Sequence, residues 1–297
     1  MVGRNVLDHP LIGEFDVLAP NSRELNLLDF YAVQAYLQVN KPDMVIHAAG
    51  KVGGIQANMR EPVGFLINNL DMGRNIVWAA KQAGVKRLLN LGSSCMYPRN
   101  HTEALTEDMV LKGELEPTNE GYALAKVVTA RLCEYIVRED SSYQYKTLIP
   151  CNLYGCYDKF DPAHSHLIPA IIYKIHQAQQ SGQQSVVIWG DGTARREFMF
   201  AGDLADAIVH AITNFDAVPA KMNIGLGYDH TINDYYSTAA EVMGYVGSFV
   251  HDTTKPIGMA RKLVNVGLQK VWGWLPRHSL HEGIEKTYEY YLKKCQS

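Results

Sequence analysis

The strongest constraint on the fold is an alternation of short apolar runs with segments that carry apolar residues at helical spacing. The apolar runs occupy residues 43–49, 87–91 and 146–150, and helical spacing marks residues 61–83 and 121–139. Each apolar run ends in small or polar residues such as glycine, serine and asparagine. Short buried strands that alternate with helices are typical of a parallel sheet covered on both faces, which binds ligands at the carboxyl ends of its strands. The sequence therefore predicts an α/β fold with a doubly wound parallel sheet.

The beginning of the chain departs from this pattern. Residues 1–7 are typical of the opening of a helix, and the first strand-like run is 16–19. In a Rossmann-type fold the first strand lies at the centre of the sheet and leads into a loop of the form G-x-x-G-x-x-G. We expect Gly3 to be the last glycine of that loop, with the first strand and two more glycines upstream of Met1, so that a chain starting at Met1 binds the dinucleotide poorly. The alternative is that Met1 is the true start and residues 1–7 form an unrelated lead-in helix.

The strand and helix pattern loosens after Gly155. We therefore expect residues 1–155 to form the dinucleotide-binding domain. Residues 156–297 are expected to form mainly a smaller C-terminal α/β substrate lobe, with some segments returning to the first domain.

Composition argues against several classes of protein. A net charge of −3 and a pI near 6.4 indicate no nucleic-acid surface. No apolar run reaches the ~18 residues that a membrane span requires, so we expect no membrane contact and a cytoplasmic location. The cysteines form no Cys-x-x-Cys pair, which gives no indication of a metal site. We expect five free thiols, namely Cys95, Cys133, Cys151, Cys156 and Cys295.

Tyr122 and Lys126 lie four residues apart in the predicted helix 121–139, so both side chains leave the same helix face. An ammonium beside a phenol favours the phenolate, which predicts a lowered pKa for Tyr122 and makes it a candidate general acid. Ser93 follows the apolar run 87–91, where it can hydrogen-bond the oxygen that Tyr122 protonates. The spacing alone occurs by chance in many helices, but its place after a strand that ends in Gly-Ser-Ser makes it specific.

Ser22 and Arg23 follow the strand-like run 16–19. Sites specific for NAD usually place an acidic residue there to hold the ribose hydroxyls, whereas arginine and small polar groups suit a 2'-phosphate. These two residues therefore favour NADP as the cofactor. The alternative is that Arg23 is a solvated loop charge.

Four motifs resemble those of the GDP-L-fucose synthase family, within the extended short-chain dehydrogenases/reductases: Gly92–Pro98, Tyr122–Lys126, Asn152–Gly155 and Ser165–Pro169. Shorter matches elsewhere extend the resemblance over nearly the whole chain. The resemblance implies a homodimer in which the helices 61–83 and 121–139 pair across a two-fold axis. It also implies an NADPH-dependent enzyme that epimerises a GDP-4-keto-6-deoxymannose at carbons 3 and 5 and then reduces carbon 4, giving GDP-L-fucose.

The resemblance also implies roles for individual residues. Ser93 and Tyr122 bind the keto oxygen, Lys126 holds the nicotinamide ribose, and Cys95 and His166 exchange the protons of the two epimerisations. Thiols and imidazoles suit this task because they titrate near pH ~8.5 and ~6.5, close to neutrality. The expected substrate contacts are Ser93, Lys174, Trp189, Arg196 and Lys262. The expected cofactor contacts are Gly3, Ser22, Arg23, Leu91, Gly92, Ser93, Ser94, Lys126, Pro150, Cys151, Asn152, Leu153 and His166.

One departure from the family pattern leaves the product open. Ile257 stands where the family has an aspartate, so a carboxylate contact to the nucleotide sugar is lost. GDP-L-colitose synthases resemble the same family and invert only carbon 5 of a 3-deoxy sugar. A nucleotide-sugar 4-epimerase with tightly held NAD needs Tyr122 and Lys126 but not Cys95 and His166. A non-catalytic NAD(P)-sensing protein is disfavoured, because such proteins commonly lose the tyrosine and lysine pair.

Overall fold

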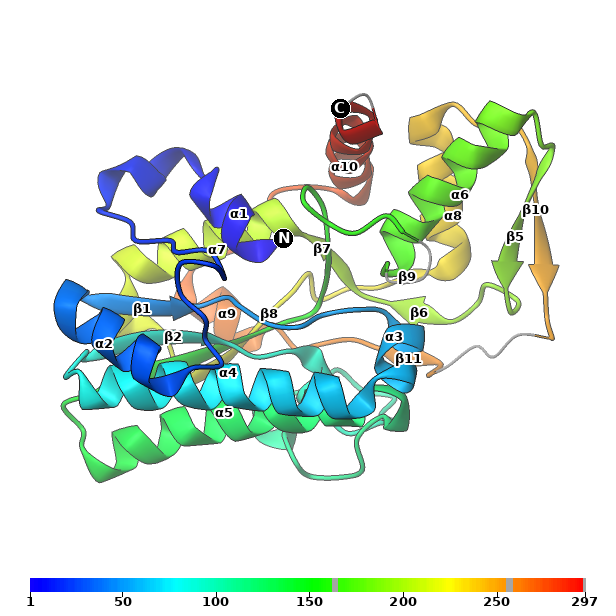
Figure 1. Ribbon diagram of the computed structural model, residues 1–297. Helices are drawn as coiled ribbons and strands as arrows, with labels where there is room; N and C mark the ends of the chain where they lie inside the picture. Colours follow the sequence, from blue (N-terminus) through cyan, green and yellow to red (C-terminus); the bar gives the residue numbers. More distant parts are fainter. Residues whose placement is uncertain (162–164, 255–258, 296–297) are drawn as a thin grey trace.

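The computed structural model describes residues 1–161, 165–254 and 259–295 (Figure 1). Its centre is a four-stranded sheet in the order β1-β2-β3-β8, in which every neighbouring pair is parallel. The strands are Met44–His47 (β1), Arg87–Leu91 (β2), Gln144–Pro150 (β3) and Lys221–Ile224 (β8). The predicted parallel sheet and three of its predicted strands are therefore confirmed.

Helices cover both faces of this sheet (Figure 1). On one face, Val77, Leu88 and Ile136 belong to one buried cluster, which joins the helices on that face to the strands. On the other face, Leu148 and Ile208 belong to a second cluster. The first face carries α2 (Phe30–Asn40), α4 (Pro62–Gln82) and α5 (Glu120–Glu139), and the second carries α1 (Val2–Leu7) and α7 (Ala201–Thr213).

The expected strand at residues 16–19 is wrong, since this segment is exposed and forms no strand. A strand needs hydrogen bonds to a neighbour, and no strand of the described part of the chain lies beside these residues. β1 consequently ends the sheet on that side.

The remaining strands form three small sheets, β5 with β10, β4 with β7, and β11-β6-β9. A third buried cluster unites α6, α8 and α10 with the neighbouring strands, and includes Ile172, Tyr235 and Ile284. The strands are β4 (Asn152–Tyr154), β5 (Ser185–Trp189), β6 (Arg195–Arg196), β7 (Phe198–Phe200), β9 (His230–Thr231), β10 (Ser248–Asp252) and β11 (Arg261–Lys262). The other helices are α3 (Ile55–Arg60), α6 (Leu167–Ser181), α8 (Ile232–Met243), α9 (Gly267–Trp272) and α10 (Leu280–Cys295).

The helix that carries Tyr122 is held closely against α4. A Cβ placed on Gly73 would lie 2.1 Å from Thr129 Oγ1, and one placed on Gly121 would lie 3.1 Å from the Pro62 carbonyl oxygen. Only glycine permits so close an approach of two helices. These glycines therefore set the distance between α5 and α4, and with it the position of Tyr122 and Lys126.

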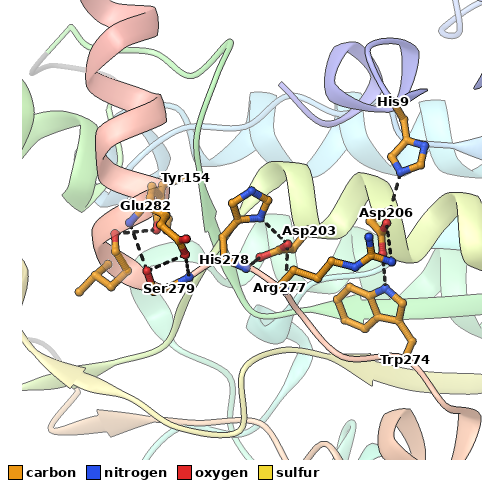
Figure 2. Close-up of polar contacts among 10 residues, drawn as sticks. His9, Tyr154, Asp203, Asp206, Trp274, Arg277, His278, Ser279 and Glu282 are labelled. Carbon is orange, nitrogen blue, oxygen red and sulfur yellow. Dashed lines mark hydrogen bonds and ion pairs between the residues drawn. The ribbon is translucent and has the colours of Figure 1, made fainter. Parts of the chain in front are cut away.

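Polar contacts tie α7 to the segment that leads into α10 (Figure 2). His278 Nδ1 lies 2.8 Å from Asp203 Oδ1, and the Trp274 indole donates to Asp206 Oδ2 at 2.7 Å. His9, which follows α1, lies 3.3 Å from the other oxygen of Asp206. Because Asp203 is 1% exposed and charged groups need partners when buried, this network fixes α1, α7 and the approach to α10 together.

Candidate active site

The structure brings Ser93, Tyr122 and Lys126 together at the carboxyl end of β2. Ser93 caps a short 3-10 helix, Ser94–Met96, that follows the strand, and its hydroxyl hydrogen-bonds the Tyr122 phenol. The Lys126 ammonium donates to the carbonyl of Leu91, the last residue of β2, at 2.9 Å. The three residues thus form a compact group that can bind an oxygen and supply it with a proton.

The expected direction of the Tyr122 pKa is wrong. Burial raises the pKa of the phenol above its usual value, and the neighbouring Cys95 raises it further, while the Ser93 hydrogen bond lowers it. Lys126 does not reverse this effect because its nitrogen lies 5.8 Å from the ring centroid and is directed at the Leu91 carbonyl. Tyr122 therefore holds its proton throughout the neutral range, which suits a proton donor.

Lys126 and His47 are two buried bases at the same strand ends. Burial lowers the pKa of Lys126 to about 8. Burial, and then the charge of Lys126, lowers the pKa of His47 to about 3. His47 is therefore neutral near pH 7, and Lys126 carries the positive charge.

Cys95 lies between two nitrogen donors that sequence reasoning did not connect with it. The Asn119 amide donates to the Cys95 sulfur at 3.1 Å, and the Lys262 ammonium lies 3.8 Å from the same sulfur. The Cys95 backbone N–H donates to Ser93 Oγ at 3.2 Å. Lys262 thus belongs to the Cys95 group in this structure. Asn119 precedes Tyr122 by three residues, and this helical spacing was the signal that could have revealed it.

His166 caps the beginning of α6 and faces Asp158. Burial lowers the pKa of His166, and the Asp158 carboxylate opposes this effect. The pKa of Asp158 is raised, because its own burial outweighs the attraction of His166. The structure records no direct contact between His166 and Cys95, both of which lie in its described part.

The expected cofactor contacts fall into two groups. Leu91 ends β2 beside Lys126, and Gly92 and Ser94 follow it. A Cβ on Gly92 would lie 3.0 Å from Met96 Sδ, so this turn is tightly packed. The neighbouring strand ends supply Pro150, Cys151, Asn152 and Leu153. By contrast, Gly3 lies within α1, and Ser22 and Arg23 lie in an exposed turn. None of these three residues contacts Ser93, Tyr122 or Lys126 in the described part of the chain.

The expected substrate contacts also separate. Lys174 donates to the Val187 carbonyl and to the Tyr236 hydroxyl, both at 3.3 Å, and its nitrogen lies 5.5 Å from the centroid of a Trp189 ring. Burial lowers the pKa of Lys174. Arg196 lies on β6, directly paired in parallel register with Lys262 on β11. The expected substrate contacts therefore form two pairs. Lys174 lies beside Trp189, and Arg196 is paired with Lys262, which contacts Cys95.

Sequence reasoning missed Glu197, which is 1% exposed. Its carboxylate accepts backbone hydrogen bonds from Leu226, Gly227 and Val264 at 2.7, 3.0 and 2.8 Å. No local pattern reveals these partners, because they come from distant parts of the chain. Ile257, the departure from the family pattern, lies outside the described residues.

Among residues 1–161, 165–254 and 259–295, no group of three histidine, cysteine or acidic side chains could hold a metal ion. None of the helices within these ranges is long and apolar enough to cross a membrane.

Comparison with known proteins identifies the family. Residues 1–225 match the NAD dependent epimerase/dehydratase family. The chain is 54% identical over 294 residues to the GDP-L-colitose synthase of Yersinia pseudotuberculosis, a match that covers 99% of this chain and 96% of that protein. It is 48% identical over 292 residues to the GDP-L-fucose synthase of Azorhizobium caulinodans, covering 98% of this chain and 93% of that protein.

A solved structure agrees with this match. The GDP-mannoheptose C4 reductase from Campylobacter jejuni with NADP bound has a TM-score of 0.87 and 27% identity, and the match covers 98% of this chain and 95% of that chain. The present chain therefore belongs to the NAD dependent epimerase/dehydratase family and, within it, to the group that contains the GDP-L-colitose and GDP-L-fucose synthases.

Proposed function

We propose that this protein is a bifunctional enzyme that epimerises GDP-4-keto-6-deoxy-D-mannose and reduces it with NADPH to GDP-L-fucose. The observation that carries the proposal is that Ser93, Tyr122 and Lys126 form one compact group with Cys95 beside it. A simple 4-epimerase has no need of the cysteine. The identity to GDP-L-fucose and GDP-L-colitose synthases over nearly the whole chain supports the same class of reaction.

In the reduction, Ser93 and Tyr122 hold the keto oxygen at carbon 4. Tyr122 donates its proton to this oxygen, and its raised pKa keeps the proton available until the oxygen becomes basic. The Lys126 ammonium, charged below about pH 8, stabilises the tyrosinate that remains.

The residues present fit NADPH. A Cβ on Gly50 would lie 3.9 Å from Lys126 Nζ and 3.1 Å from Asn69 Oδ1, so a side chain there would fill the space beside Lys126. Lys126 would hold the nicotinamide ribose, and Ser22 and Arg23 would receive the 2'-phosphate. When bound, NADPH supplies the hydride for carbon 4. A relative of known structure has NADP bound, which supports this cofactor.

In the epimerisation, Cys95 and His166 exchange protons with the carbons next to the ketone. These protons are acidic because the enolate spreads its charge onto the keto oxygen. Inversion requires that one group removes the proton and another returns a proton to the opposite face. Burial lowers the pKa of His166 and the Asp158 carboxylate opposes this effect, so Asp158 can stabilise the imidazolium whenever His166 holds the proton that it exchanges.

The GDP moiety would lie toward Lys174, Trp189 and Arg196. Two cationic side chains suit a diphosphate, and the indole, 48% exposed, offers an apolar surface. We assign most of residues 156–297 to this substrate lobe and residues 1–155 to the cofactor.

A second product is supported by the 54% identity to a GDP-L-colitose synthase. That reaction requires a 3-deoxy sugar and inversion at carbon 5 only. The test is to incubate the protein with NADPH and each of the two GDP-4-keto sugars, and to identify the products by NMR. GDP-L-fucose from the 3-hydroxy substrate supports the main proposal, and turnover of the 3-deoxy substrate alone supports the alternative.

We further propose a homodimer in the cytoplasm. Exposed apolar side chains follow one stripe of α4 and one of α5, two helices that lie side by side (Figure 1). Apolar stripes of this kind are typical of helices that pack against a partner. All five cysteines are free, which fits a reducing compartment. The stripes comprise Val63, Ile67 and Trp78 on α4 and Leu124, Val128 and Tyr135 on α5.

A further inference from the structure

The Cys95 sulfur is approached from two separate parts of the chain. Asn119, at the end of the turn before α5, donates its amide N–H at 3.1 Å, and the ammonium of Lys262 on β11 lies at 3.8 Å. A lysine ammonium can only donate hydrogen bonds, so the sulfur is the acceptor on that side. Two donors directed at one sulfur favour its negatively charged form.

Asn119 has a second, unused polar atom. Its Oδ1 is buried and has no hydrogen-bond partner among the described residues. A buried acceptor without a partner is unfavourable, and such atoms at a site are commonly satisfied by a ligand. Oδ1 belongs to the same amide whose N–H donates to Cys95, so it lies close to the sulfur. A sugar hydroxyl has the donor that this oxygen lacks.

We propose that Asn119 and Lys262 are positioning residues that hold Cys95 as a thiolate, and that Asn119 Oδ1 accepts a hydrogen bond from a sugar hydroxyl. The proposal rests on the assignment of Cys95 to the epimerisation. In that step the C–H bond next to the ketone breaks, its proton bonds to Sγ, and the electron pair becomes the enolate. Sγ is then a neutral thiol. How strongly Lys262 and Asn119 stabilise the thiolate determines how readily Sγ accepts the proton.

Among the described residues, Lys262 from β11 and Tyr122 from α5 are titratable groups that interact with Cys95. Tyr122 remains neutral near pH 7, because burial raises its pKa. Lys262 is therefore the positive charge that lies against this sulfur. The expected signature is a Cys95 that reacts with an alkylating reagent at a pH where an ordinary thiol is mostly protonated.

The test is the rate at which iodoacetamide modifies Cys95, followed by peptide mass spectrometry between pH 6 and 9 in the full-length protein. Lys262→Met should slow the reaction at pH 7 about tenfold, and Lys262→Arg should restore most of it, as expected for loss and return of a charge close to sulfur. Asn119→Leu should slow the alkylation and also raise KM for the GDP-sugar. Lys270→Met, an exposed lysine on α9, serves as the matched control.

Unchanged alkylation in both Lys262→Met and Asn119→Leu overturns the proposal, whatever the activity of these variants. If Asn119→Leu slows the alkylation but leaves KM for the GDP-sugar unchanged, the proposed hydrogen bond from a sugar hydroxyl to Asn119 Oδ1 is overturned. Exchange of the substrate protons into D2O, followed by NMR with the wild-type protein, tests the proposed function separately. Wild-type protein that alkylates rapidly but exchanges no proton refutes the epimerase assignment and leaves the thiolate assignment standing.

Discussion

The carboxylate of Glu197 accepts a hydrogen bond from the backbone N–H of Val264 at 2.8 Å, although the two residues are far apart in the sequence. Val264 lies two residues after Lys262, and Glu197 follows Arg196 directly. The same carboxylate accepts from Leu226 and Gly227, which follow β8. Glu197 therefore joins the end of the central sheet to the two strands that carry the expected substrate cations.

The first prediction is a pH-dependent stability that depends on Glu197. Burial raises the pKa of this carboxyl from 4.5 to about 7, against the opposing effect of its backbone hydrogen bonds. Between these values the folded protein holds a proton that the unfolded chain has released, so the free energy of unfolding decreases as pH rises. The total change has an upper limit of about 3 kcal/mol at ~1.4 kcal/mol per pKa unit.

Denaturant unfolding at pH 5 and pH 8 measures this effect. The wild type should lose more stability than Glu197→Gln over this range, because glutamine does not titrate. Glu285→Gln, which changes an exposed glutamate on α10, should follow the wild type. Equal pH slopes for wild type and Glu197→Gln would show that Glu197 keeps an ordinary pKa.

The second prediction concerns the proton donor. Tyr122→Phe should reduce the rate of NADPH oxidation by roughly 10²- to 10⁴-fold, because the ring remains and only the acidic proton is lost. The affinity for the GDP-sugar should change little in a titration by calorimetry. Tyr31→Phe, at a residue that is 78% exposed, is the control. Near-normal NADPH oxidation by Tyr122→Phe would exclude this residue from the mechanism.

The third prediction is an alkaline limit on the reduction. Lys126 has a folded pKa of about 8, below its usual value, so it carries its charge below that pH and loses it above. The kcat for reduction should therefore fall about tenfold per pH unit above pH ~8. Lys126→Arg should remove this decline, since a guanidinium stays charged. A profile that is flat to pH 10 in the wild type would contradict this role of Lys126.

The fourth prediction is a preference for NADPH over NADH. Arg23 lies in an exposed turn, where its guanidinium is free to reach a 2'-phosphate. Arg23→Ala should lower kcat/KM for NADPH about tenfold and leave that for NADH unchanged. Arg138→Ala, an exposed arginine on α5, should affect neither. Equal catalytic efficiency of the wild type with both cofactors would refute the preference.

The fifth prediction concerns the apolar stripe on α5. Val128 is 46% exposed in the single chain, so Val128→Glu would bury a charge only if another copy packs on this helix. Sedimentation at micromolar concentration should show a wild-type dimer and a Val128→Glu monomer. Val246→Glu, at a residue that is 97% exposed, should remain dimeric. A monomeric wild type would rule out the dimer.

The sequence was sufficient to predict the elements whose signals are local. Periodic apolar spacing gave the helix at 121–139, observed as Glu120–Glu139, and the run 87–91 gave a strand with the same bounds. The failed strand at 16–19 shows the limit of such signals, because strand formation requires a neighbour that spacing alone cannot supply.

The site was predictable to the extent that its residues lie in recognisable motifs. Tyr122, Lys126 and Ser93 lie together in the structure, as their motifs predict, because strand ends of a parallel sheet converge, while their catalytic roles stay predictions. The direction of the Tyr122 pKa shift could not be predicted in this way, because it depends on burial rather than on the spacing to Lys126. Glu197 and the partners of Cys95 depend on contacts between distant segments, which a single sequence does not display.

The register between β6 and β11 has a consequence for how the nucleotide is used. Arg196 and Lys262 are register partners on neighbouring parallel strands, so a displacement of one strand moves the other with it. If Arg196 binds the diphosphate, the position of the bound diphosphate determines where Lys262 lies relative to the Cys95 sulfur. Binding of the nucleotide then changes the rate of proton abstraction, because part of its binding energy lowers the barrier of the chemical step. A 4-keto sugar offered without its GDP would lose turnover rate as well as affinity.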